Sequence, residues 1–152
     1  MNRKDRTPSR KRWMRTFLAM NSSDRNLCLE AACLLVFARI VLLIFPFKWL
    51  PGLVRFRQEK ITPCQEQLPR AQRASWAVRT VAPRIPLRLL CLPQAIALKW
   101  MLNLRSIRSV MRFGVKKGSQ EGFKAHAWVL VDDTPVIGRV RLRDYSTIAS
   151  FD

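Results

Sequence analysis

One cysteine and the only histidine of this chain of 152 residues lie 35 positions apart (126 − 91), with a helical pattern after the first and a strand pattern around the second. Apolar residues recur at three- and four-residue spacing from Leu90 to Leu102, which predicts a helix. Pro93 suits its first turn, where the missing N–H leaves no helical bond unmade. Cys91 therefore stands at the helix N-terminus, where free N–H groups and the positive end of the helix dipole favour an anion such as a thiolate.

The residues after this helix alternate in the manner of β-strands. We expect strands over 110–115, 123–131 and 136–140, separated by turns over 116–122 and 132–135. A period of two places His126, Trp128 and Leu130 on one face of the second strand. A helix that begins with cysteine and packs on an antiparallel sheet carrying histidine is the arrangement of cysteine proteases and transglutaminases. The sequence therefore predicts an α+β fold of the papain/transglutaminase-like kind.

Both residues also have a structural interpretation. A buried cysteine commonly behaves as a small inert hydrophobe. A lone histidine on a half-apolar strand is commonly a hydrogen-bonded core residue. Only the combined order of cysteine, helix, strand, turn, histidine and strand favours a catalytic pair.

Further motifs surround this pair: Cys91-Leu92-Pro93-Gln94-Ala95, Phe113-Gly114-Val115, Ala125-His126-Ala127-Trp128-Val129 and Val136-Ile137-Gly138. Together they resemble the lasso-peptide leader peptidases, the transglutaminase-like B proteins of lasso peptide biosynthesis, over roughly residues 27–151. The resemblance implies a cysteine peptidase that removes the leader from a ribosomally made precursor peptide. It implies two partners, a leader-binding recognition protein and an ATP-dependent macrolactam-forming cyclase. It implies no cofactor and no metal for the peptidase itself.

The resemblance implies Cys91 as nucleophile and His126 as base, and it leaves the third group open. The family usually carries an aspartate twelve residues after the histidine, where this chain has Gly138. A backbone carbonyl or Asp144 could orient the imidazole instead, whereas Asp132 and Asp133 are expected to form the turn. Gln94 lies one turn after Cys91 on the same side of the helix and could donate to an oxyanion, or simply cap or pack.

Composition limits the alternatives. The net charge of +18 favours nucleic acid, anionic lipid or an acidic peptide as partner, but no nucleic-acid-binding signature accompanies it, so we expect no nucleic acid. With one histidine and no C-x-x-C, a zinc site is not expected. Because no clear secretory signal is present, we expect reduced thiols and a cytoplasmic protein, with membrane association as an alternative. The four cysteines are Cys28, Cys33, Cys64 and Cys91.

The pattern divides the chain into a flexible basic arm over 1–21 and one domain over 22–152. An apolar helix begins near Ser22 and runs from Leu27 to Phe45; we expect it buried in the domain or in a partner interface, with peripheral membrane contact as the alternative. Residues 47–56 are expected to continue as an amphipathic segment, 58–70 as a linker and 71–82 as a short helix.

Two other functions remain open on the sequence. The same Cys–His chemistry transfers an acyl group when an amine replaces water. A non-catalytic membrane- or nucleic-acid-binding protein would instead use Cys91 and His126 as core residues.

Overall fold

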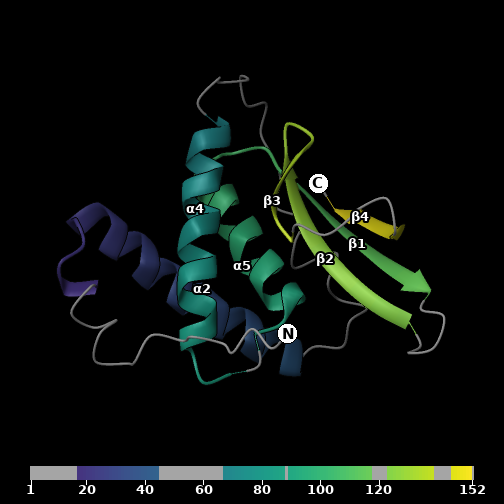
Figure 1. The fold of residues 1–152 in the computed structure, drawn as a ribbon, viewed down its shortest axis with the longest axis horizontal. Coiled ribbons are helices and arrows are strands. Elements are labelled where there is room, and N and C mark those ends of the chain that lie inside the picture. Colours follow the sequence, from purple (N-terminus) through teal and green to yellow (C-terminus); the bar gives the residue numbers. More distant parts are fainter. Residues whose placement is uncertain (1–16, 45–66, 88, 118–122, 139–144, 152) are drawn as a thin grey trace, which may run out of the picture.

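The computed structural model describes residues 17–44, 67–87, 89–117, 123–138 and 145–151. A layer of helices lies against one antiparallel sheet (Figure 1). The helices are α2 (Ser22–Ile44), α4 (Gln67–Val81), the short 3₁₀ helix η2 (Ala82–Arg84) and α5 (Cys91–Leu104). The strands are β1 (Val110–Lys117), β2 (Phe123–Val131), β3 (Thr134–Ile137) and β4 (Ser146–Phe151), in the spatial order β3-β2-β1-β4. This is the predicted α+β architecture.

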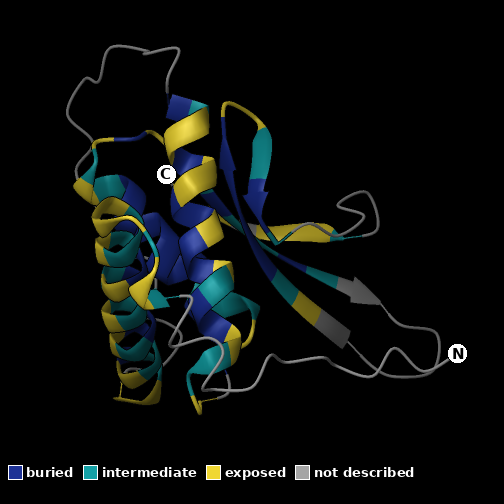
Figure 2. Ribbon diagram, turned by 60° about the vertical axis from the view of Figure 1, so that its left-hand side comes forward, coloured by how far each residue is buried: buried dark blue, intermediate teal, exposed yellow. Residues whose placement is uncertain are grey.

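Helix α5 is central because it is apolar nearly all round. It packs against α2 and α4 on one side and against β2 on the other, and from Ala95 to Leu102 every residue is buried. Lys99 is the polar member of this run, and its ammonium group donates to the Ser109 carbonyl oxygen at the entry to β1. Figure 2 shows the buried residues where helices and sheet meet and the exposed residues on the outward sides of the helices.

Small residues allow α4 to approach α5 closely. Its buried face consists of Ala71, Ala74, Ala77, Val78 and Val81, together with the buried Ser75. The predicted helix is confirmed, but it begins four residues earlier, at Gln67, than the expected start at 71. The prediction of a linker up to residue 70 was wrong at this end. Pro69 lies in the first helical turn, where proline removes no intrahelical hydrogen bond.

Helix α2 is buried along one face only. Cys28, Ala31, Leu35, Ala38 and Val41 pack into the core at helical spacing, while Leu29, Phe37 and Ile40 on the opposite face are exposed. The prediction that the domain buries this helix therefore holds for half of its surface. Phe17, which the prediction assigned to the basic arm, packs against the core. Residues 1–16 of the arm, the segment predicted over 47–56 and residues 58–66 of the predicted linker lie outside the described residues.

The sheet differs from the prediction at its two edges, and β1 continues beyond the predicted 110–115 to Lys117, into the predicted turn. Strand β2 runs from Phe123 to Val131 as expected, and a two-residue turn with positive φ at Asp132 and Asp133 joins it directly to β3. Strand β3 begins at Thr134 and ends at Ile137, earlier at both ends than the predicted 136–140. The opposite edge strand β4, paired with β1, was not predicted.

Candidate active site

Cys91 is the first residue of α5, and the sequence before it explains how the helix begins there. Leu90 has extended backbone dihedral angles and supplies no side-chain cap. The backbone N–H groups of the first turn therefore have no N-cap side chain as partner. The Cys91 side chain is half-buried and its thiol is free of any disulfide. The thiol lies at a helix start whose backbone N–H groups have no side-chain cap, which is the local arrangement that the sequence predicted.

Gln94 turns back toward the residues that precede the helix. Its Nε2 donates to the Leu89 carbonyl oxygen at 2.7 Å. This contact ties the first turn of α5 to the segment that leads into it. The bond does not cap the helix, because it donates to a carbonyl and satisfies none of the free N–H groups of the first turn. It fits a packing role, and the oxyanion role of Gln94 stays a prediction.

His126 lies in the first half of β2, on the face it shares with Trp128, and its ring is half-buried. Its Nε2 is 3.1 Å from the carbonyl oxygen of Gly138. A carbonyl can only accept, so Nε2 carries the hydrogen in this contact. In the neutral ring the lone pair is then on Nδ1, which is left free to accept a proton.

The carbonyl that accepts from His126 belongs to Gly138. Gly138 is the position at which the resemblance to the lasso-peptide leader peptidases predicts an aspartate. Gly138 has φ = +75°, in the region that favours glycine. A Cβ built on it would lie 2.6 Å from the Ala127 carbonyl oxygen and 2.8 Å from the Trp128 Cβ. No side chain fits here without a shift of the backbone, so the chain presents a main-chain oxygen to the imidazole in place of a carboxylate.

Aromatic rings enclose the imidazole. The ring centroids of His126 and Tyr145 are 5.6 Å apart, and those of His126 and Trp128 are 6.2 Å apart. Trp128 is almost fully buried, and its ring lies over Gly114, the residue paired with His126 in β1, where a Cβ would come within 2.8 Å of it. Tyr145 was not predicted as a site residue, although it is the only tyrosine and lies near the downstream end of the resemblance.

A buried serine holds β3 near the site. Ser75 of α4 donates its hydroxyl to the Val136 carbonyl oxygen at 2.5 Å, two residues before Gly138. Because β3 is short, this contact helps to fix where the chain turns away at Gly138. Sequence reasoning missed Ser75, since a serine among alanines in a helix is common.

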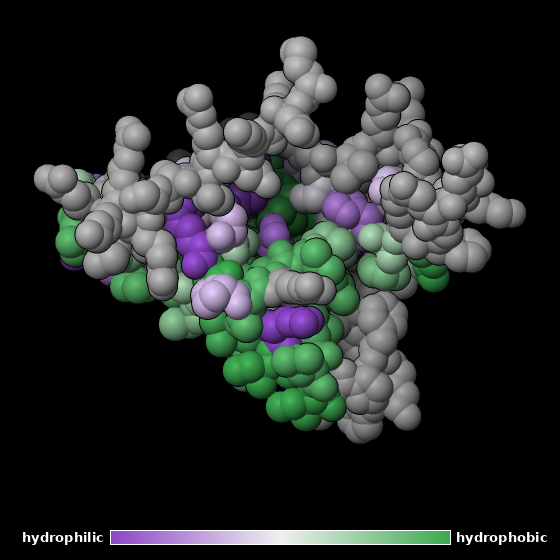
Figure 3. Space-filling model, turned by 60° about the horizontal axis from the view of Figure 1, so that its bottom comes forward, coloured by the Kyte–Doolittle hydropathy of each residue, from purple (hydrophilic) through white to green (hydrophobic). Residues whose placement is uncertain are grey.

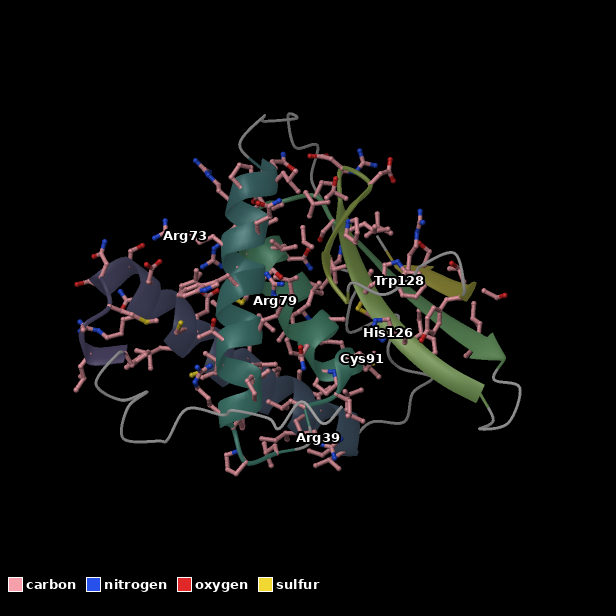
Figure 4. All side chains as sticks on the ribbon, in the orientation of Figure 1. Arg39, Arg73, Arg79, Cys91, His126 and Trp128 are labelled. Atoms are coloured by element: carbon pink, nitrogen blue, oxygen red, sulfur yellow. The ribbon has the colours of Figure 1, made fainter. Side chains whose placement is uncertain are left out.

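Packing of α5 against β2 brings the elements that carry Cys91 and His126 together. Figure 4 draws the two residues at the same end of this contact. No hydrogen bond joins the thiol to the imidazole among the contacts of the described residues, which is common for catalytic pairs without substrate. Asp144, the other candidate to orient His126, lies outside the described residues. Asp132 and Asp133 are exposed turn residues.

A separate cavity of about 570 Å³ lies at the N-terminal half of α2. The ion pair of Arg105 with Glu30, at 2.5 Å, lines it. Arg73 also lines it and pairs with Asp24 at 2.6 Å. The carboxylate of Glu30 raises the pKa of the Arg105 guanidinium by hydrogen bonding. None of the residues proposed for catalysis lines this cavity. Among the described residues, no group of three or more His, Cys, Asp and Glu side chains could hold a metal ion.

Residues 33–150 match the model of the Transglutaminase-like superfamily. The chain belongs to this superfamily. The match spans the cysteine helix, the histidine strand and Gly138, and it agrees with the helices packed on a four-stranded antiparallel sheet. Members of the superfamily are often cysteine peptidases or acyltransferases. Comparison with curated proteins and with solved structures found no match.

Proposed function

We propose that this protein is a cysteine peptidase that removes the leader from a lasso-peptide precursor. Membership of the superfamily supports thiol chemistry at a peptide or amide carbonyl. The motifs around Cys91 and His126 support the narrower assignment through their resemblance to the lasso-peptide leader peptidases. The observation that carries the proposal is the contact between His126 Nε2 and the Gly138 carbonyl oxygen, because it leaves Nδ1 free for the thiol proton.

The proposed reaction uses a dyad. Nδ1 of His126 takes the Cys91 proton as the sulfur attacks the scissile carbonyl carbon. The carbon–nitrogen bond then breaks, and the imidazolium returns the proton to the leaving amine. Water hydrolyses the resulting thioester and regenerates the thiol. The Gly138 carbonyl keeps the imidazole in one tautomer, which is the task a carboxylate performs in a triad.

Backbone groups at the start of α5 would stabilise the oxyanion. The N–H groups of the first turn have no N-cap side chain, and the helix dipole adds positive potential at the same point. A leader-binding protein would deliver the precursor, and a cyclase would use the newly freed amine. Both partners are inferred from the resemblance, and the positive charge of the chain suits an acidic leader or partner.

The test is mass spectrometry of the precursor peptide encoded beside this gene, incubated with the purified protein and the leader-binding partner. We expect free leader from the wild type, none from Cys91→Ala, and a rate lowered about 100-fold or more in His126→Ala. Cys33→Ala is the matched control, because this exposed cysteine of α2 lies outside the proposed site. Its rate should equal that of the wild type.

Four other results would change the proposal. An adduct formed without uptake of water would indicate acyl transfer. An Asp144→Asn variant as inactive as His126→Ala would replace the dyad by a triad. Full cleavage by Cys91→Ala, or no cleavage by folded wild type with the precursor bound, would refute a thiol peptidase.

A further inference from the structure

The outward face of α2 is apolar along most of the helix. We call it the outer stripe of α2; it consists of Leu29, Cys33, Phe37, Ile40, Leu43 and Ile44. Its five large side chains are between 45% and 69% exposed. Figure 3, in which the lower end of the molecule comes forward, shows apolar side chains gathered at the end where α2 finishes. A stripe of this length needs an apolar partner, because monomeric proteins rarely expose one.

Charged residues of α2 stay at the borders of the stripe. Helical spacing places Glu30 on one border and Arg39 on the other. Glu30 is bound by Arg105, so its charge is compensated. Arg39 is half-buried and long enough to carry its guanidinium to the rim while its stem covers apolar surface. From Leu29 to Ile44 the exposed positions of the helix carry no charge.

The rest of the chain is strongly basic, with a net charge of +18. The sequence shortly before α2 carries Arg3, Lys4, Arg6, Arg10, Lys11, Arg12 and Arg15, and the sequence after it carries Lys48, Arg55, Arg57 and Lys60. A second copy of this chain would bring another +18 to the interface, so repulsion opposes self-association. Nucleic acid would match the positive charge, but its anionic backbone offers no apolar surface to cover the outer stripe.

An anionic bilayer surface matches both features. We propose that the outer stripe of α2 docks this protein on membranes that contain anionic lipid, with the helix lying in the interface. The helix is long and apolar enough to cross a membrane by length and composition. Its inner face, however, packs on α4 and α5, so the folded domain can insert only the outer stripe. The net charge of +18 would attract the protein to the lipid phosphates.

Vesicle flotation with the full-length protein tests this proposal without any use of the proposed catalytic activity. We expect binding to vesicles of phosphatidylcholine and phosphatidylglycerol, weak binding to phosphatidylcholine alone, and loss of binding as salt screens the charges. Leu43→Glu should weaken binding by about tenfold or more, because it removes an inserted side chain and adds a charge. Leu43 lies in the last turn and is exposed, so this change should leave the fold intact.

Ile148→Glu is the matched control. Ile148 is 62% exposed on β4, the edge strand on the far side of the sheet from α2 (Figure 1). The variant adds the same charge and should bind vesicles like the wild type. The rate at which Cys33 is alkylated gives a second readout. Anionic vesicles should lower this rate in the wild type, because they would cover the outer stripe.

Several results would overturn the proposal. The first is that the wild type and Leu43→Glu bind anionic vesicles equally well. The second is that Leu43→Glu and Ile148→Glu lose vesicle binding to the same extent. The third is that the wild type does not bind vesicles. A lipid-free dimer that Leu43→Glu dissociates would assign the stripe to a second copy. Binding of the stripe to a purified protein partner in place of vesicles would assign it to that partner.

Discussion

The lasso-peptide leader peptidases that this chain resembles usually carry an aspartate where this protein has Gly138. Replacing Gly138 by aspartate should damage this protein, even though it places a carboxylate near His126. Gly138 has φ = +75°, and a residue with a side chain in the left-handed region is destabilised by about 1–2 kcal/mol. The new Cβ would also meet the Ala127 carbonyl oxygen at 2.6 Å and the Trp128 Cβ at 2.8 Å. Overpacking of this kind typically adds about 1–3 kcal/mol. Together these effects amount to about 2–5 kcal/mol, a large share of the roughly 5–15 kcal/mol that stabilises a domain.

The assay compares Gly138→Ala and Gly138→Asp with the wild type by thermal unfolding and by leader cleavage. A loss of this size lowers the melting temperature by roughly 4–20 °C for a chain of this length. Both variants should also cleave more slowly, because relief of the clash moves the carbonyl that holds His126 Nε2. Gly138→Ala separates the steric effect from the charge, and the aspartate should give no gain over the alanine.

One result would refute this reasoning. If Gly138→Asp has the melting temperature of the wild type and cleaves the leader faster than the wild type, the backbone has room for a carboxylate at this position. The Gly138 carbonyl would then not be the group that orients the imidazole, and the dyad would be an incomplete triad.

Three further predictions concern Gln94 and Ser75, which lie near the site, and Cys28 on the buried face of α2. Gln94→Ala should lower stability by about 1 kcal/mol through loss of the bond to the Leu89 carbonyl; a fall in kcat of about 100-fold or more at unchanged stability would instead make Gln94 an oxyanion donor. Ser75→Ala should cost about 1–3 kcal/mol in denaturant unfolding, because a buried carbonyl of β3 loses its partner; no loss would show that water replaces the hydroxyl. Burial, and then the charge of Asp24, raise the pKa of the Cys28 thiol. The folded state therefore holds this proton more tightly than the unfolded state, and stability should fall as pH rises above about 8.5 toward the raised pKa. Cys28→Ala should flatten that fall in urea unfolding measured across the alkaline range; an identical slope would assign it to other groups.

Much of the fold follows from local sequence patterns. The helix from Cys91 to Leu104 and the strand from Phe123 to Val131 were predicted because their periods of apolar residues are long and unbroken. The errors lie where local signals are ambiguous. Pro69 indicated a linker but lies in a first turn, where proline is harmless. Strand β4 (Ser146–Phe151) has a short pattern with little burial and exists because it pairs with β1.

The candidate site divides in the same way. Residue types and spacing alone singled out Cys91 and His126, since a helix start favours a thiolate and a lone histidine has few competitors. The role of Gly138 could not be read from its identity, because glycine has no side chain and the direction of its carbonyl depends on where β3 ends. Tyr145 reaches the imidazole only because the chain returns to the sheet edge at β4.

The sequence by itself determined the order of elements up to β3, the positive charge, the apolar length of α2 and the two residues able to perform thiol chemistry, because each of these depends on residue type and local period. The tertiary structure alone decided which half of α2 is buried, which atom faces His126 Nε2 and that position 138 has no room for a side chain. These properties depend on contacts between residues far apart in the chain, and packing in three dimensions fixes them.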